Sequence, residues 1–121
     1  MKNLEIKLKV KPLSANQMYW RGKRVKTKTY LDYQNEVRDE MMGVEWPFGS
    51  DPVSFWIKAG LSARQADLDN LLKPLFDTFQ NVFDDFNDNK VYYIEAYKDI
   101  VPKGEEYIHV IIERTNSEDE L

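Results

Sequence analysis

The spacing of apolar residues along this chain changes between the period of a strand and the period of a helix. Over residues 4–10 apolar and charged residues alternate, which predicts a strand with one buried face. Over residues 30–42 apolar residues recur at helical spacing, and Gly43 follows as a stop signal. The same reasoning predicts further strands at 53–59, 91–100 and 106–113, and a second amphipathic helix after Ala66.

The order strand, helix, strand, helix, strand, strand indicates an α+β domain with one mixed sheet and helices packed on it. Neither a linker nor an internal repeat interrupts this order, so we expect a single domain over residues 1–114. Pro102-Lys103-Gly104 is expected to join the last two strands as a hairpin turn. Residues 115–121 are polar and acidic, and we expect them to form a flexible tail.

Composition excludes several classes of protein and of site. The 121 residues suffice for one core, and 42% hydrophobic with 31% charged residues favours a globular chain. We expect no membrane association, because no apolar run is long enough to span a bilayer and the N-terminus lacks a signal-peptide pattern. Cysteine is absent, which excludes disulfides and thiolate chemistry and fits a reducing cytosol. His109 is the only histidine and lies in a strand-like run, so we expect a packed or surface histidine, and metal chemistry must use carboxylates.

The stretch from Ala66 to Asp77 combines acids and a lysine at the start of a helix. Asp67 and Asp69 project to the same side if the backbone there is extended. Lys73 follows Asp69 by one helical turn, so its ammonium can lie over the same place. Mg²⁺ prefers carboxylate oxygen and water, and a helix N-terminus favours anions. With an acid returning from downstream, the stretch predicts a site for Mg²⁺ and a phosphate.

The same acids also have an explanation that involves no chemistry. Asp69 or Asn70 can cap the helix, and the acids within 84–88 can belong to a solvated turn. Pro74 must lie in the first turn of the helix or kink it. Spacing alone leaves both the structural and the metal-binding interpretations open.

Positive charge gathers in the first third of the chain, although the net charge is −4. Residues 1–40 hold ten Lys and Arg against five Asp and Glu, and the remainder holds seven against sixteen. Between Ser14 and Thr29 no helical period is present and Gly22 provides a turn, so we expect an exposed basic loop or loose hairpin. It is suited to nucleic-acid backbone, with Tyr19 or Trp20 available to stack on a base; a merely solvated loop is the alternative. The basic residues concerned are Arg21, Lys23, Arg24, Lys26 and Lys28.

Asp67-Leu68-Asp69-Asn70-Leu71-Leu72-Lys73-Pro74-Leu75-Phe76-Asp77 resembles the D-x-D-N-x-x-K-x-x-x-D signature of RusA-type Holliday junction resolvases. Asn87-Asp88-Asn89-Lys90-Val91 is similar to the D-D-x-Q-V segment that follows in that family, and Asp88 falls on its second aspartate. Asp84-Asp85 is a competing match for that pair. The opening 12–16 and the basic loop also fit, and the likeness weakens after about residue 98.

The resemblance implies a RusA-like fold and a Mg²⁺-dependent, homodimeric endonuclease. Such enzymes bind four-way DNA junctions in recombination and repair and nick two strands symmetrically. The resemblance implies that Asp67, Asp69 and Asp88 bind the metal and that these three acids and Lys73 are catalytic. Members are often encoded by phages, which implies a cytoplasmic protein of a bacterial or phage-infected cell.

This chain departs from the family pattern at Asn87 and Lys90. These departures leave a second hypothesis, a non-catalytic protein of the same fold that binds branched DNA. A third hypothesis is an acidic interaction module whose carboxylates only cap and solubilise.

Overall fold

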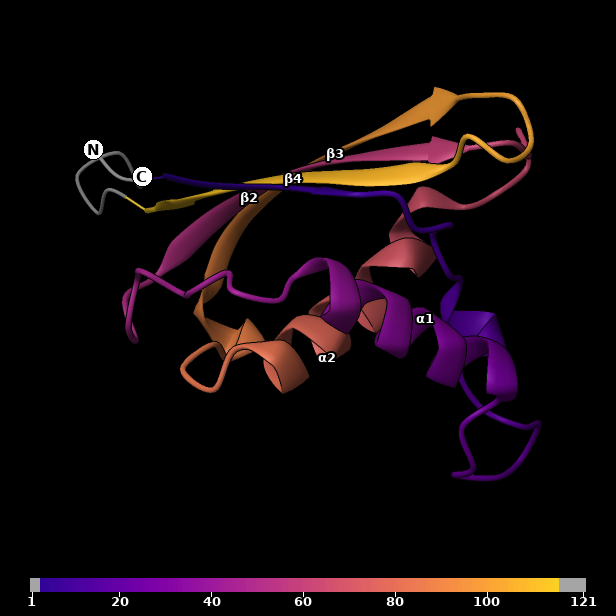
Figure 1. The fold of residues 1–121 in the computed structure, drawn as a ribbon, viewed down its shortest axis with the longest axis horizontal. Coiled ribbons are helices and arrows are strands. Elements are labelled where there is room, and N and C mark those ends of the chain that lie inside the picture. Colours follow the sequence, from indigo (N-terminus) through magenta and orange to yellow (C-terminus); the bar gives the residue numbers. More distant parts are fainter. Residues whose placement is uncertain (1–2, 116–121) are drawn as a thin grey trace.

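Four strands form one mixed sheet in which β4 and β2 are central and β1 and β3 are the edges (Figure 1). The computed structural model describes residues 3–115. β4 (Tyr107–Arg114) pairs antiparallel with β1 (Asn3–Leu8) on one side and with β2 (Val53–Leu61) on the other. β3 (Val91–Ile100) pairs with β2 in parallel. The predicted α+β class is therefore confirmed, in a single small domain; the predicted tail, Thr115 apart, lies outside the described residues.

The predicted hairpin between the last two strands is wrong, because β2 lies between β3 and β4. Residues 102–104 do form a turn, in which Gly104 has a φ of 95° and Glu105 N donates to Pro102 O at 3.0 Å. That turn carries the chain past the end of β2 instead of joining neighbouring strands. Burial explains the order: three residues of β4 are at most 3% exposed, whereas no residue of β3 is fully buried. The more apolar strand takes the central place and the more polar strand takes the edge.

Helices α1 (Lys28–Glu40) and α2 (Leu72–Val82) lie on the same side of the sheet (Figure 1). α1 begins earlier than its apolar stripe because Thr27 caps it, accepting a hydrogen bond from Tyr30 N at 3.1 Å. The predicted stripe of α1 is buried throughout: Tyr30, Tyr33, Val37 and Met41.

None of the helices in the described range is both long enough and apolar enough to cross a membrane.

Aromatic side chains from β2, α2 and the loop after α2 form the centre of the core. The ring of Phe55 lies 5.0 Å from Phe76 and 5.8 Å from Phe86, measured between centroids. Trp46 covers the edge of this group, with its ring 4.8 Å from Phe86 and 5.0 Å from Phe48. Such pairs contribute about 0.5–1.5 kcal/mol each beyond simple burial. The aromatic turn at 46–49 therefore belongs to the edge of the core.

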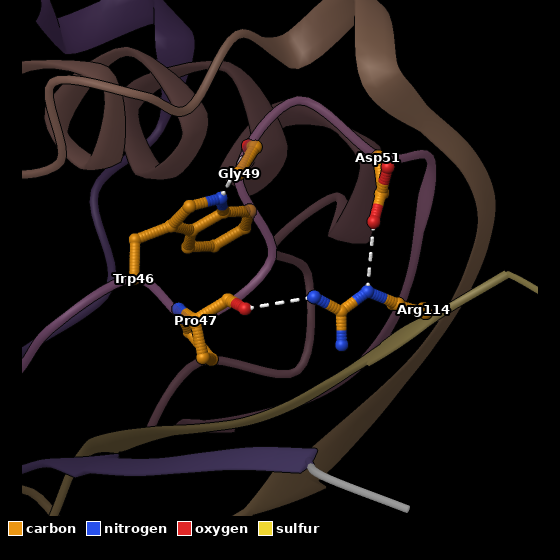
Figure 2. A network of polar contacts seen from close by, with 5 residues as sticks. All are labelled: Trp46, Pro47, Gly49, Asp51 and Arg114. Atoms are coloured by element: carbon orange, nitrogen blue, oxygen red, sulfur yellow. Dashed lines mark hydrogen bonds and ion pairs between the residues drawn. The ribbon is translucent and has the colours of Figure 1, made fainter.

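The end of β4 holds this aromatic turn in place (Figure 2). Arg114 pairs through Nε with Asp51 at 2.9 Å and donates through Nη2 to Pro47 O at 2.9 Å. Trp46 Nε1 donates to Gly49 O at 3.0 Å, which closes the turn itself. Because two nitrogens of the guanidinium bond to this turn, the turn that leads into β2 is fixed to the neighbouring strand.

The side of the sheet away from the helices has no described element over it (Figure 1). Paired residues of neighbouring strands share a face, so this open face includes residues from all four strands. Side chains of its two central strands and of β3 surround a hollow of about 380 Å³. Among its lining residues are Trp56, Lys58, Tyr97, His109 and Ile111.

Candidate acidic site and basic hairpin

The loop before the acidic stretch is held by a lysine of the edge strand. Lys98 Nζ donates to Arg64 O at 2.9 Å and to Ala66 O at 2.7 Å. The loop follows β2, and β3 is the parallel neighbour of β2. The lysine therefore fixes the backbone immediately before Asp67.

Asp69 lies on a short 3₁₀ helix, η2 (Leu68–Leu71), and Asp67 is the residue immediately before it. Only Asp67 is extended, with φ −82° and ψ 121°, so the continuous extended backbone on which the expected projection of both carboxylates depended is absent. The turn forms because Leu71 is buried against the end of β2. Both carboxylates are exposed, and Asp67 accepts only a long bond of 3.5 Å from Asn70 Nδ2.

Neither Asp69 nor Asn70 caps the helix that follows, so that expectation is wrong. α2 begins at Leu72, its N-cap position is Leu71, and no side chain bonds to its first amides. Pro74 is the third residue of α2 and therefore lies in the first turn, as predicted, where its missing N–H costs no helical bond.

Lys73 pairs with Asp77 one turn further along α2, at 3.2 Å. Their side chains are 63% and 23% exposed. The expected position of Lys73 over Asp69 is replaced by this pair, which is typical of residues four apart on a helix. Asp77 was not among the predicted site residues, although its spacing from Lys73 could have identified the contact.

Asp88 begins another short 3₁₀ helix, η3 (Asp88–Lys90), beyond the other end of α2. Its backbone N–H donates to Gln80 Oε1 at 2.9 Å, in the last turn of α2. The 11 residues of α2 rise roughly 16 Å. The single chain therefore separates Asp88 from Asp67 and Asp69, and Asp88 as the third ligand stays a prediction.

Within residues 3–115, no three Asp, Glu, His or Cys side chains gather closely enough to hold a metal ion. Mg²⁺, however, is commonly held by one or two carboxylates together with water and substrate phosphate. The exposed carboxylates of Asp67 and Asp69 fit that pattern in donor type and in access. The predicted pocket of three acids is not assembled within the described part of one chain.

Residues 19–26 form a tight hairpin that extends beyond the start of α1 (Figure 1). Trp20 N donates to Val25 O at 2.9 Å, and Lys23 N donates to Trp20 O at 2.9 Å. Gly22 has a φ of 70°, which the turn requires. The tip is exposed and forms a shallow hollow of about 390 Å³ lined by Trp20, Arg21, Lys23 and Val25. The expected basic loop or loose hairpin is thus a hairpin, which we call the basic hairpin.

Two of the predicted DNA-binding lysines have partners within the chain. Lys26 Nζ donates to Gln34 Oε1 at 3.1 Å and lies 5.3 Å from the centre of the Tyr30 ring. Lys28 pairs with Asp32 at 2.8 Å. Lys26 therefore anchors the root of the basic hairpin on α1. A role of either lysine in DNA binding stays a prediction.

Tyr30 connects the basic hairpin with α2. Its ring lies 5.9 Å from the ring of Tyr19, measured between centroids. Burial, and after it the nearby carboxylate of Asp77, raises the pKa of Tyr30 to about 12. Asp77 is the partner of Lys73, so the root of the basic hairpin and the Lys73–Asp77 pair lie beside the same buried phenol.

His109 has a structural partner, which confirms that it is a surface strand histidine. Its Nε2 lies 2.7 Å from Glu5 Oε2 on the adjacent strand. Its side chain is 28% exposed and lies on the open face of the sheet.

In comparisons with known proteins, no family model and no curated protein matches this chain. The resemblance to the resolvases therefore depends on the motif residues alone.

Proposed function

We propose that this protein is a Mg²⁺-dependent endonuclease that resolves branched DNA such as a four-way junction. One observation supports the proposal: Lys26, at the root of the basic hairpin, and Asp77 of α2, which pairs with Lys73, both lie beside Tyr30. A nuclease needs positive charge to attract the DNA backbone and carboxylates close to where that backbone lies. The motif residues that resemble the resolvases lie in this segment.

Each charged group has a role in hydrolysis of the phosphodiester. Asp67 and Asp69 would hold Mg²⁺, which when bound activates water and neutralises charge on the phosphoryl oxygens. Lys73 is mostly exposed, so its ammonium is free to exchange the Asp77 contact for a phosphate oxygen. Asp77 holds the ammonium near the site until DNA arrives. Arg21, Lys23 and Arg24 would contact the backbone, and Trp20 presents a ring that can stack on a base.

Paired nicks in two strands require two such sites, so we propose that the protein acts as a homodimer. Action on cellular or phage DNA would place it in the cytoplasm of a bacterial or phage-infected cell.

Substitution of the acids tests the proposal. Asp67→Asn and Asp69→Asn should each reduce cleavage of a labelled four-way junction in Mg²⁺ by at least about a hundredfold, while binding stays equal or tightens because a repulsive charge is lost. Asp51→Asn is the matched control, since Asp51 is exposed and pairs with Arg114 away from the site. Wild-type cleavage by both variants would show that the site is assigned wrongly.

The same assay decides the third ligand. Asp88→Asn, Asp84→Asn and Asp85→Asn remove the competing candidates one at a time. A loss confined to Asp88→Asn supports the family-derived assignment, and no loss in any of them supports a site of two carboxylates.

A second candidate function is binding of branched DNA without cleavage. It is favoured by the absence, within residues 3–115, of three metal-ligating side chains in one place. A junction that is shifted in a gel but stays uncut with Mg²⁺ supports the binder. Symmetric nicks that disappear with a chelator support the enzyme.

A further inference from the structure

The outer edge of β3 has no strand beside it in the described part of the chain. β3 pairs only with β2, so half of the backbone N–H and C=O groups of its ten residues point to this free edge. None of these residues is proline, and five of them carry aromatic or aliphatic side chains that are at least 40% exposed. A long and apolar edge of this kind is a template on which a further strand can pair.

Three aromatic rings flank the carboxylate of Glu95 on the open face. Tyr93 and Tyr97 lie two residues before and after Glu95, so the three side chains share this face. Trp56 is the partner of Glu95 on β2, and its ring lies 5.7 Å from that of Tyr93, measured between centroids. Glu95 accepts a hydrogen bond from Tyr93 OH at 2.7 Å and another from Tyr97 OH. We call these four residues the Glu95 cage; its fourth side is the free edge of β3.

The carboxylate of the Glu95 cage has no cation beside it. The hydrogen bonds from Tyr97 and Tyr93 lower the pKa of Glu95, so the carboxylate is charged at neutral pH. Within residues 3–115, no lysine, arginine or histidine lies within ion-pair distance of it. The faces of Trp56 and Tyr97 are accessible, because both residues line the 380 Å³ hollow. Aromatic faces around a negative charge are suited to binding a guanidinium or ammonium group.

We propose that the free edge of β3 binds an extended segment of a partner protein, with an arginine of that segment placed over Glu95 among the three rings. The backbone of the segment would continue the sheet as an additional strand. Arginine fits better than lysine, because its planar guanidinium stacks on rings and bonds to a carboxylate through two nitrogens. The residues on either side of this arginine would meet Ile94 and Ala96 on the other face of β3, so they should be apolar.

Charge favours a basic peptide over a nucleic acid as the occupant. The described strands place more acids than lysines on the open face: Glu5, Glu95, Asp99 and Glu113 against Lys7 and Lys58. Exposed rings on a sheet can also stack on bases, but this excess of carboxylates repels a phosphate backbone. The same excess attracts a cationic segment.

This surface is separate from the proposed active site, because α2 lies on the other side of the sheet (Figure 1). The inference therefore goes beyond the proposed function and does not depend on it.

Binding of a peptide to the full chain tests the proposal. The probe is a fluorescein-labelled peptide, Thr-Thr-Val-Arg-Val-Thr-Thr, and the matched peptide has glutamine in place of arginine. Fluorescence anisotropy should show about tenfold tighter binding of the arginine peptide, because only arginine forms a charge-assisted bond to Glu95. Glu95→Gln should remove this preference. Glu113→Gln, which removes an equal charge elsewhere on the same face, should keep it.

Two further measurements test the geometry. The amides of β3 that point to its free edge should exchange hydrogen more slowly when the arginine peptide is bound, whereas those of β1, at the opposite edge, should not change. Trp56→Leu keeps an apolar side chain but removes the ring, and should weaken binding of the arginine peptide severalfold.

Several outcomes would overturn the proposal. They are absence of binding, equal affinity of the two peptides, equal loss in Glu95→Gln and Glu113→Gln, and slowed exchange that spares β3. An oligothymidine that binds more tightly than the arginine peptide, and loses affinity in Trp56→Leu, would assign the face to nucleic acid instead. Self-association of the chain that weakens in Glu95→Gln would assign it to a second copy. Since no junction is present in these assays, their failure leaves the proposed cleavage standing.

Discussion

The ring of Tyr107 lies across Gly60, and this single close approach links three strands. An ideal Cβ at residue 60 would lie 2.3 Å from two carbons of the ring, so only glycine leaves the space. From there Tyr107 OH donates to Asp99 Oδ2 at 2.7 Å, which connects β4 with β3 across β2. This bond raises the pKa of Tyr107 to about 12, so the phenol stays a neutral donor well above physiological pH.

Gly60→Ala should lower the free energy of unfolding by about 1–3 kcal/mol, because the added methyl must displace the ring. Gly60 does not have a positive φ, so backbone strain does not contribute. Urea unfolding of a double-mutant cycle with Tyr107→Ala isolates the contact, since the cost of Gly60→Ala should largely disappear once the ring is gone. Strictly additive costs in this cycle would contradict the explanation.

At the scale of the element, local periodicity was sufficient to predict individual strands and helices. It was not sufficient to predict which strands pair with each other. The stripe of α1 and the alternation of β1 are set by neighbours within a turn or two, so the sequence predicts them. The order of the strands depends on which distant faces bury each other best. Residues 102–104 have the composition of a hairpin turn, yet β2 inserts between the strands that they join. The residues of the turn itself do not indicate which strand becomes the neighbour of β4.

In the candidate site too, contacts set by local spacing could be predicted, whereas those set by tertiary packing could not. The Lys73–Asp77 pair follows from spacing on one helix and could be predicted. The backbone of Asp69 could not, because the 3₁₀ turn there follows from packing of Leu71 on β2. The contact of Lys26 with Gln34 was also not predictable. Gln34 is buried on the apolar side of α1, and nothing in the sequence marks it as the partner of a lysine.

The lysine at the root of the basic hairpin should stabilise the fold, whereas the lysine at its tip should contribute to DNA binding. Lys26→Ala removes the partner of the buried Gln34 carbonyl and should lower the free energy of unfolding by about 1–2 kcal/mol. Lys23→Ala, at the exposed tip, should change stability by less than about 0.5 kcal/mol but weaken junction binding. Urea unfolding and fluorescence anisotropy with labelled DNA measure the two effects. Equal stability of the two variants would show that Lys26 does not anchor the hairpin.

Over the whole molecule, charge is distributed so that an acidic protein can still attract DNA. The net charge is −4, yet the exposed tip of the basic hairpin carries Arg21, Lys23 and Arg24. In the described part of the chain none of these three forms an ion pair, unlike Lys28 at the start of α1. Because the hairpin extends away from the sheet and helices, its cations are separated from the acids of the remainder (Figure 1).

Salt should therefore weaken junction binding in proportion to the cations at the tip. Each phosphate neutralised contributes about −0.9 to the slope of log affinity against log salt. The variant with Arg21, Lys23 and Arg24 all changed to Ala should reduce the steepness by up to about 3, whereas Lys103→Ala should leave it unchanged. Anisotropy titrations of an uncut junction with a chelator, at salt between about 50 and 200 mM, give the slopes. Because the fold does not depend on these exposed side chains, an unchanged slope in a folded triple variant would mean that DNA binds another surface, and the hairpin would lose its part in the proposed function.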